Sequence, residues 1–210
     1  MLRQTLIACL GLTSVAFAKP PPDVTVSTVA ATIADWPIGA SLDGYIETKG
    51  QASARKLDIA TAALAGSSVP GPIPQRQLLA LILVTWHGES RFALDVHRGE
   101  PGIWGSDDGR AACLGQLHSN ARLPREAWEA TKGTDIEATT NCAMATARAL
   151  QSAAATCGYD GAEYSIHRVL RQYGSGTGDC NPALASDLSL SRILKRTTRA
   201  MRLSWSMGAK

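Results

Sequence analysis

The sequence predicts a mainly α-helical protein with a single domain and a small irregular loop or β region. The chain has 210 residues, 45% of them hydrophobic, which suits one domain with a real core. Segments with apolar residues at helical spacing lie on both sides of a polar, glycine-rich stretch at residues 93–112. No internal repeat and no glycine-rich nucleotide-binding motif is visible, so we expect no cofactor and no nucleic-acid partner.

The first eighteen residues, "MLRQTLIACLGLTSVAFA", predict a signal peptide. They have a basic start, an apolar run and a small-x-small ending at residues 16–18, which is the layout of a cleaved secretory signal. The "KPPP" that follows would break a continuing helix. We therefore expect an exported protein, periplasmic or secreted. A buried N-terminal helix and a lipid-attachment site at Cys9 are the alternatives.

Residues 19–53 are rich in Pro, Gly, Thr and Ser and show no sustained period. They predict an N-terminal extension, with short strand-like pieces such as "DVTVSTV" at 23–29. The main domain is expected to span residues 54–205, followed by a short tail at 206–210.

Two helices are predicted before the polar stretch. In "ARKLDIATAALAG" (54–66), apolar residues recur at Leu57, Ala60 and Leu64, and Gly66 is placed to stop the helix. "QRQLLALILVTWH" (75–87) is apolar all round its middle. The second helix should therefore be buried on nearly every side.

Four further helices are predicted after the polar stretch, at residues 124–133, 136–158, 162–174 and 188–201. The last of them continues as an amphipathic segment, because every charged side chain after Asp187 is basic. We expect one face to hold Leu190, Ile193, Leu194, Thr197, Met201 and Trp205. This basic helix either closes the domain or lies on an anionic membrane or cell-wall surface.

Four cysteines remain after the signal: Cys113, Cys142, Cys157 and Cys180. An even set in an exported protein predicts two disulfides, for which three connectivities are open. If Cys142 and Cys157 share one helix they lie about 22 Å apart, far beyond disulfide reach. We favour Cys113 with Cys142 and Cys157 with Cys180.

Glu89 is the candidate catalytic residue. It lies at the carboxyl end of the apolar helix, where desolvation and the negative end of the helix dipole both disfavour a charged carboxylate. We therefore expect Glu89 to keep its proton near neutral pH, as the acid of a glycosidase does. The alternative is that Glu89 caps a loop or pairs with Arg91 or Arg98 at the surface.

Four stretches of the chain resemble, in order and spacing, the motifs of lysozyme-like lytic transglycosylases of the SLT type. They are "GESRF" (88–92), "AACLGQLHSNA" (111–121), "TTNCAMATARAL" (139–150) and "VLRQYGSGTG" (169–178). The resemblance covers about residues 54–200. It implies a lysozyme-like fold and cleavage of the β-1,4 bond between N-acetylmuramic acid and N-acetylglucosamine in peptidoglycan.

The resemblance also implies roles for single residues. Glu89 takes the place of the catalytic acid, and Ser90 that of the hydroxyl residue after it. Gln116 matches the Gln that lines the groove, Asn141 the Asn that opens the next core helix, and Tyr173 the Tyr that hydrogen-bonds near the acid. In enzymes of this type one Glu protonates the glycosidic oxygen and then takes a proton from the muramic 6-hydroxyl, which closes an anhydro ring.

The chain departs from the family pattern at three positions. Cys113, Gly115 and Gly174 stand where the family has Gly, Met and Asn. The apolar Met contact with the substrate is therefore missing, and the loop after the Tyr is expected to have a different shape. These departures leave the substrate preference open.

Other functions remain open from the sequence. A hydrolytic lysozyme needs a second carboxylate, for which the loop offers Asp95, Asp107 and Asp108. A catalytically silent wall-binding protein would keep the scaffold without turnover, and a thiol hydrolase would use Cys113 with His118. The pattern His87-Gly88-Glu89 lacks the P-C-x-x-C of zinc deaminases, so no metal site is expected. Trp104 is the candidate for stacking on a sugar ring.

Overall fold

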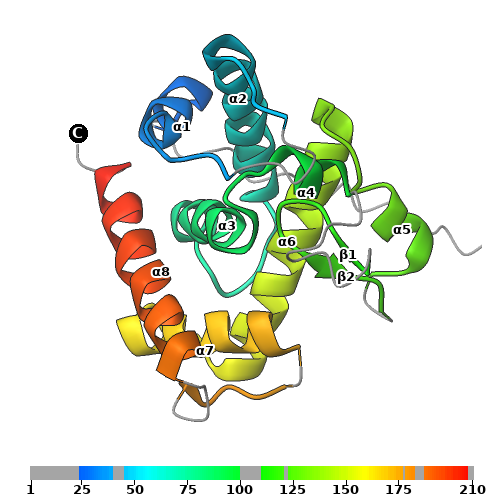
Figure 1. The fold of residues 1–210 in the computed structure, drawn as a ribbon. Coiled ribbons are helices and arrows are strands. Elements are labelled where there is room, and N and C mark those ends of the chain that lie inside the picture. Colours follow the sequence, from blue (N-terminus) through cyan, green and yellow to red (C-terminus); the bar gives the residue numbers. More distant parts are fainter. Residues whose placement is uncertain are drawn as a thin grey trace, which may run out of the picture.

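The fold is described from a computed structural model (Figure 1). The structure describes residues 24–39, 45–99, 110–120, 123–176, 178–182 and 187–207, without the side chains of 187–190. The expected signal peptide with Cys9, the sugar-stacking candidate Trp104, and Asp107 and Asp108 lie outside these ranges.

The described residues form a mainly helical structure with one small hairpin, which confirms the predicted class. In chain order the elements are α1 (Val26–Ile33), α2 (Lys49–Gly66), α3 (Gln75–Ser90), α4 (Leu94–Arg98), β1 (Ala111–Ala112), β2 (Leu117–His118), α5 (Arg125–Glu129), α6 (Ile136–Cys157), α7 (Glu163–Ser175) and α8 (Asp187–Ser206). Strands β1 and β2 pair antiparallel, with Ala111 opposite His118 and Ala112 opposite Leu117. Among these described residues, no helix is both long and apolar enough to cross a lipid bilayer.

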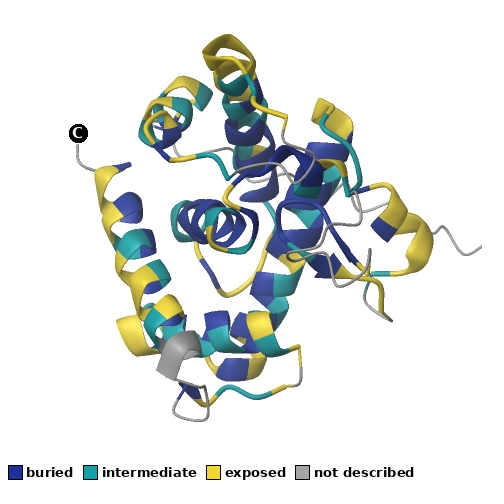
Figure 2. Ribbon diagram, viewed as in Figure 1, coloured by how far each residue is buried: buried dark blue, intermediate teal, exposed yellow. Residues whose placement is uncertain are grey.

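Helix α3 is the centre of the structure. Every residue from Leu78 to Trp86 is buried, and α3 contacts α2, α6 and α8 (Figures 1 and 2). The expected burial on nearly every side is confirmed. The helix ends at Ser90, and its C-cap residue, Arg91, has a left-handed φ of 50°. Glu89 therefore lies in the last helical turn, next to the core.

The N-terminal segment differs from the prediction. The stretch expected to form strand-like pieces forms helix α1, with Thr25 as its N-cap. Val29 and Ile33 are fully buried, four residues apart on one helical face, and α1 packs on α2. Burial of this face outweighs the strand preference of Val and Thr, because tertiary packing routinely overrides intrinsic propensity.

Helix α2 begins at Lys49, five residues before its predicted start. Thr48 and Gln51 form a capping box, in which each side chain bonds to the other's backbone. Leu57, expected on the apolar face, is 48% exposed, while Ile59 and Ala60 are fully buried. At Gly66 the helix touches α6, since a Cβ there would lie 2.8 Å from the Cβ of Ala143.

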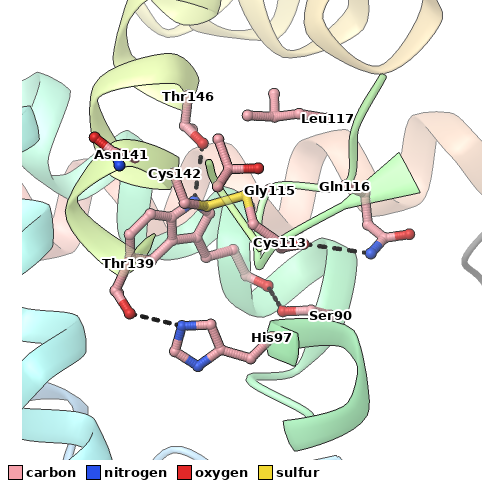
Figure 3. Close-up of a disulfide and its surroundings, with 12 residues drawn as sticks. Ser90, His97, Cys113, Gly115, Gln116, Leu117, Thr139, Asn141, Cys142 and Thr146 are labelled. Atoms are coloured by element: carbon pink, nitrogen blue, oxygen red, sulfur yellow. Dashed lines mark hydrogen bonds between the residues drawn. A yellow bond between two sulfur atoms is a disulfide. The ribbon is translucent and has the colours of Figure 1, made fainter. Parts of the chain in front are cut away.

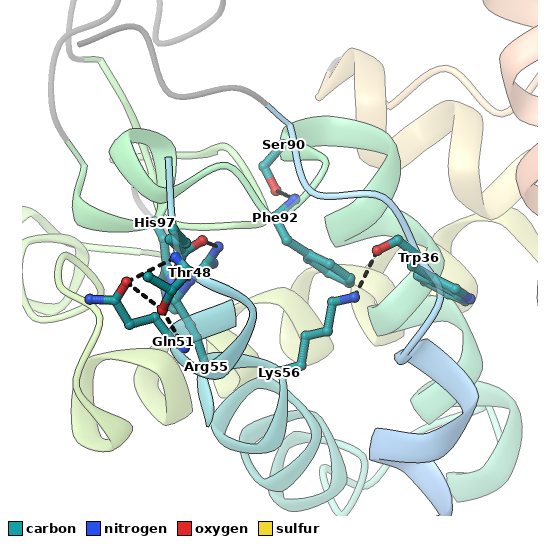
Figure 4. Close-up of polar contacts among 9 residues, drawn as sticks. Trp36, Thr48, Gln51, Arg55, Lys56, Ser90, Phe92 and His97 are labelled. Atoms are coloured by element: carbon teal, nitrogen blue, oxygen red, sulfur yellow. Dashed lines mark hydrogen bonds and ion pairs between the residues drawn. The ribbon is translucent and has the colours of Figure 1, made fainter. Parts of the chain in front are cut away.

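Lysine and arginine side chains of α2 hold the segments around it (Figure 4). Lys56 donates a hydrogen bond of 2.8 Å to the Trp36 carbonyl, beyond α1. Arg55 is buried and forms an ion pair with Glu47. Its guanidinium also lies 3.5 Å from Nδ1 of the buried His97, whose Nε2 lies 2.9 Å from the Thr139 hydroxyl on α6. The described residues before position 54 therefore pack against the rest of the helical structure.

The polar stretch contains more regular structure than expected. Helix α4 forms at residues 94–98, directly after α3, and the β1–β2 hairpin begins at Ala111. Asp95, one of the candidate second carboxylates, is 4% exposed on α4. The sequence did not indicate α4, because a helix of five residues is too short to show a helical period and the stretch around it is rich in glycine and acidic residues.

Helix α8 packs on α3 and α7 and so closes the domain (Figure 1). Ile193 and Thr197 are buried as predicted, together with Ala200 and Leu203. Leu194 and Trp205 are instead 42% and 71% exposed, so the predicted apolar face is wrong at these two positions. Arg192, Lys195 and Arg202 are exposed.

Both favoured disulfides are present. Cys113 bonds to Cys142 and Cys157 to Cys180, with Cα atoms 6.0 Å and 5.5 Å apart. Cys142 and Cys157 both lie on α6, at its first turns and its last residue, which excludes a bond between them. The first disulfide fastens the hairpin to α6, and the second fastens the segment before α8 to the end of the same helix.

Candidate active site

A groove of about 1210 Å³ lies between the hairpin, α6 and the end of α7, and Glu89 reaches it from α3. Its floor is one face of α6, where most of the lining residues are small: Ala145, Ala149, Ser152, Ala153 and Thr156. These small side chains leave room above the helix. Arg148 adds one positive charge to this face.

Gln116 enters the groove from the tight turn between β1 and β2. Its backbone N–H donates to the Cys113 carbonyl at 3.0 Å, and both residues have left-handed φ angles, 50° and 57°. Such angles are strained for residues other than glycine. The Cys113–Cys142 disulfide holds the turn against α6 (Figure 3). The Oε1 atom of Gln116 is buried without a hydrogen-bond partner in the described structure.

Tyr173 lines the same groove from α7 and holds the turn between β1 and β2 by a hydrogen bond. Its hydroxyl donates to the Gly115 carbonyl at 2.7 Å. A Cβ on Gly115 would lie 2.6 Å from the Thr146 hydroxyl and 2.9 Å from that of Tyr173. Only glycine fits between these groups, so a Met at this position would not. Burial and the charge of Glu89 raise the pKa of Tyr173, so its hydroxyl stays a donor.

Glu89 is neither unpaired nor in a wholly apolar niche, so the predicted environment is wrong. Its side chain is 26% exposed, and its Oε1 lies 2.5 Å from Nη1 of Arg196 on α8. The alternative partners, Arg91 and Arg98, are not the ones the structure uses for this ion pair. Arg196 is 107 residues away in sequence and is brought to Glu89 by the packing of α8 on α3.

Ser90 and Asn141 do not line the groove. The Ser90 hydroxyl donates to the Trp86 carbonyl at 2.7 Å and accepts from the Phe92 N–H, so it closes the end of α3. Asn141 donates to the Ala130 carbonyl at 3.1 Å and ties α6 to the end of α5. Both polar groups are used to hold backbone segments together.

His87 lies two residues from Glu89 but makes its contacts elsewhere. Its Nδ1 lies 3.1 Å from Nη1 of Arg199 and its Nε2 lies 3.2 Å from the Pro37 carbonyl. Because arginine can only donate, Nδ1 accepts and Nε2 carries the hydrogen. Burial, followed by the charge of Arg199, lowers the pKa of His87 to about 4. Arg199 in turn lies over the Trp36 ring, 3.5 Å from its centroid.

The sequence alternatives that need a metal or a thiol find no support in the described residues. No group of three or more His, Cys, Asp or Glu there could hold a metal ion. Cys113 is bonded to Cys142 and has no free thiol to act with His118.

Three residues at the site were not identified from the sequence: Arg196, Arg148 and Gln172. Gln172 is 9% exposed, lines the groove, and has a buried Oε1 without a partner in the described structure. Nothing in the local pattern distinguishes Gln172 or Arg148 from other polar residues of amphipathic helices. The sequence signal nearest to Arg196 is Gly88, a glycine within the last turn of α3 and directly before Glu89.

The chain was compared with protein-family models, with curated proteins and with solved structures, and none of the three comparisons gave a match.

Proposed function

We propose that the protein is a peptidoglycan-cleaving enzyme of lysozyme-like architecture that acts on the β-1,4 bond between N-acetylmuramic acid and N-acetylglucosamine. One observation carries this proposal. Glu89, Gln116 and Tyr173 come from three distant segments, were each matched to a motif of lytic transglycosylases, and line one groove.

The form of the groove supports a polymeric sugar as the ligand. Its floor on α6 consists mainly of small residues, and the side-chain amides of Gln116 and Gln172 line it, where amide groups suit hydrogen bonds with hydroxyl or N-acetyl groups. Arg148 can pair with the carboxylates that peptidoglycan strands carry. Glycan strands are therefore the proposed partner.

The proposed mechanism uses one carboxyl group for both proton transfers. Glu89 donates its proton to the glycosidic oxygen, and the resulting carboxylate takes the proton of the muramic 6-hydroxyl, whose oxygen closes the anhydro ring. The substrate's own N-acetyl group stabilises the positive charge. Among the described residues that line the groove, Glu89 is the only carboxylate, which favours a lyase over a hydrolytic lysozyme.

The rival function is a catalytically silent wall-binding protein. The ion pair between Glu89 and Arg196 favours it, because this contact already occupies one oxygen of the carboxyl group. Export is part of either proposal, and the two disulfides support an oxidising compartment.

The test is the clearing of purified peptidoglycan by residues 19–210. Wild-type protein should clear it, and Glu89→Gln should lower the rate by at least about a hundredfold, because an amide cannot deliver the proton. Products with anhydro-muramic ends select the lyase, and reducing ends select the hydrolase. Equal clearing by the mutant contradicts the role of Glu89. Binding of both proteins to peptidoglycan without any cleavage selects the silent wall-binding protein.

A further inference from the structure

The guanidinium of Arg196 contacts both the Glu89 carboxyl group and the helix backbone at Gly88, although Arg196 lies on a different helix. The guanidinium lies directly over the backbone of α3 at Gly88. A Cβ at position 88 would be 2.1 Å from Nε of Arg196 and 2.5 Å from its Cζ. Any side chain other than hydrogen would therefore displace the guanidinium from Glu89.

The position of Arg196 is set by the packing of α8 and not by chance contact at the surface. Its neighbours Ile193 and Thr197 are buried against the core, and only 18% of the Arg196 side chain is exposed. An ion pair that is largely shielded from water is screened less by salt than an exposed one. Its effect on Glu89 should therefore persist at physiological ionic strength.

We infer that Arg196 is a positioning residue, which aims the Glu89 carboxyl group into the groove, and that Gly88 leaves the space that the guanidinium needs. The inference rests on the proposed function, in which Glu89 transfers a proton to the substrate and later takes one from it.

Other charged or titratable groups line the same groove or flank Glu89 in the chain without taking this role. They are Tyr173 from α7, Arg148 from α6, His118 from β2, and His87 and Arg91 from its own segment. The Tyr173 hydroxyl is bonded to Gly115 and His87 contacts Pro37 and Arg199. The charge of Glu89 raises the pKa of Tyr173 and the charge of Arg196 lowers it, which is consistent with the three groups lying together.

Two substitutions test the inference by different routes. Arg196→Gln removes the positive charge, whereas Gly88→Ala keeps every charge and moves the flexible end of Arg196 away. Both should lower kcat by about tenfold, with a smaller change in KM, because the carboxyl group loses its orientation. Arg196→Lys keeps the charge and should retain most of the wild-type kcat.

Matched controls separate this effect from general ones. Arg202→Gln removes the same charge from an exposed position of α8, and Gly50→Ala adds a methyl group where nothing lies within 4 Å. Neither should lower kcat. Equal kcat values for wild type, Arg196→Gln and Gly88→Ala would overturn the inference, and so would a fall in kcat in Arg196→Gln that Gly88→Ala lacks.

A second measurement keeps this test independent of the proposed function. The Glu89 carboxyl carbon can be observed by ¹³C NMR, with Glu89→Gln identifying its signal. At one fixed pH its chemical shift should differ from wild type in Arg196→Gln and Gly88→Ala, because the carboxyl group loses its guanidinium partner. If wild-type protein cleaves no peptidoglycan, the proposed function fails, and the chemical shifts alone decide whether Arg196 holds Glu89. Equal chemical shifts in all three proteins would overturn the positioning by Arg196.

Discussion

At the scale of single residues, the absence of a side chain at Gly115 leaves room for the hydroxyl groups of Thr146 and Tyr173. Gly115→Ala places a methyl group against the hydroxyls of Thr146 and Tyr173, at 2.6 Å and 2.9 Å. We expect a loss of about 1–3 kcal/mol in the free energy of unfolding, because these neighbours are held by α6 and α7 and cannot move freely. Urea unfolding measures this change. Activity should fall as well, since Gln116 is displaced with the turn.

The same exchange at Gly50 provides the comparison for stability. Gly50 lies in the first turn of α2, and a methyl group added there would have no atom within 4 Å. Gly50→Ala should therefore change stability little or raise it slightly. If Gly115→Ala were as stable as Gly50→Ala, the close packing of Tyr173 on the turn would be refuted.

At the scale of the elements, the two disulfides should contribute about equally to the free energy of unfolding but differently to function. They close loops of similar size, with sequence separations of 29 and 23. Removing either pair by double alanine substitution should cost about 3–4 kcal/mol in the chain-entropy model. Only the loss of Cys113–Cys142 frees the hairpin turn that carries Gln116 into the groove.

Activity measured below the unfolding transition distinguishes the two disulfides. Cys113→Ala with Cys142→Ala should raise KM several-fold, whereas Cys157→Ala with Cys180→Ala should mainly lower the melting temperature. A larger KM effect from the second pair would show that the segment before α8, and not the hairpin, controls substrate binding.

For the molecule as a whole, the buried His97 and the half-buried His87 predict a loss of stability in acid. Burial, followed by the charge of Arg55, lowers the pKa of His97 to about 3, and the pKa of His87 is lowered to about 4. In the unfolded chain both take up a proton near pH 6.5. The unfolded state therefore binds more protons between about pH 6.5 and 3, and the free energy of unfolding falls as the pH falls through this range.

His97→Gln isolates one of these contributions. Between about pH 7.5 and 5, wild-type His97 alone should cost about 2 kcal/mol of stability. The variant, which cannot titrate, should be less stable at the higher pH but lose less on acidification. Urea unfolding at the two pH values gives both numbers. Parallel losses in the two proteins would mean that His97 is accessible to protons in the folded state.

Much of the fold and part of the site follow from local patterns. The periodicity of residues 75–87 predicts the buried central helix, and the spacing of Cys142 and Cys157 on one helix removes one connectivity. The matched motifs single out Glu89, Gln116 and Tyr173, which share the groove. The same reasoning misplaces Ser90 and Asn141, because a motif records the residue type and not the direction of its hydrogen bond.

The helical class, the central helix and the presence of a carboxyl group at its end can all be predicted from the chain alone, because helical periods, caps and residue types are local properties. The contact of Arg196 with Glu89, the packing of α1 on α2, and the space left at Gly88 and Gly115 become visible only in the folded protein. These features depend on how helices distant in sequence pack together. The guanidinium of Arg196, 107 residues away in sequence, reaches Glu89 only after α8 has packed against α3.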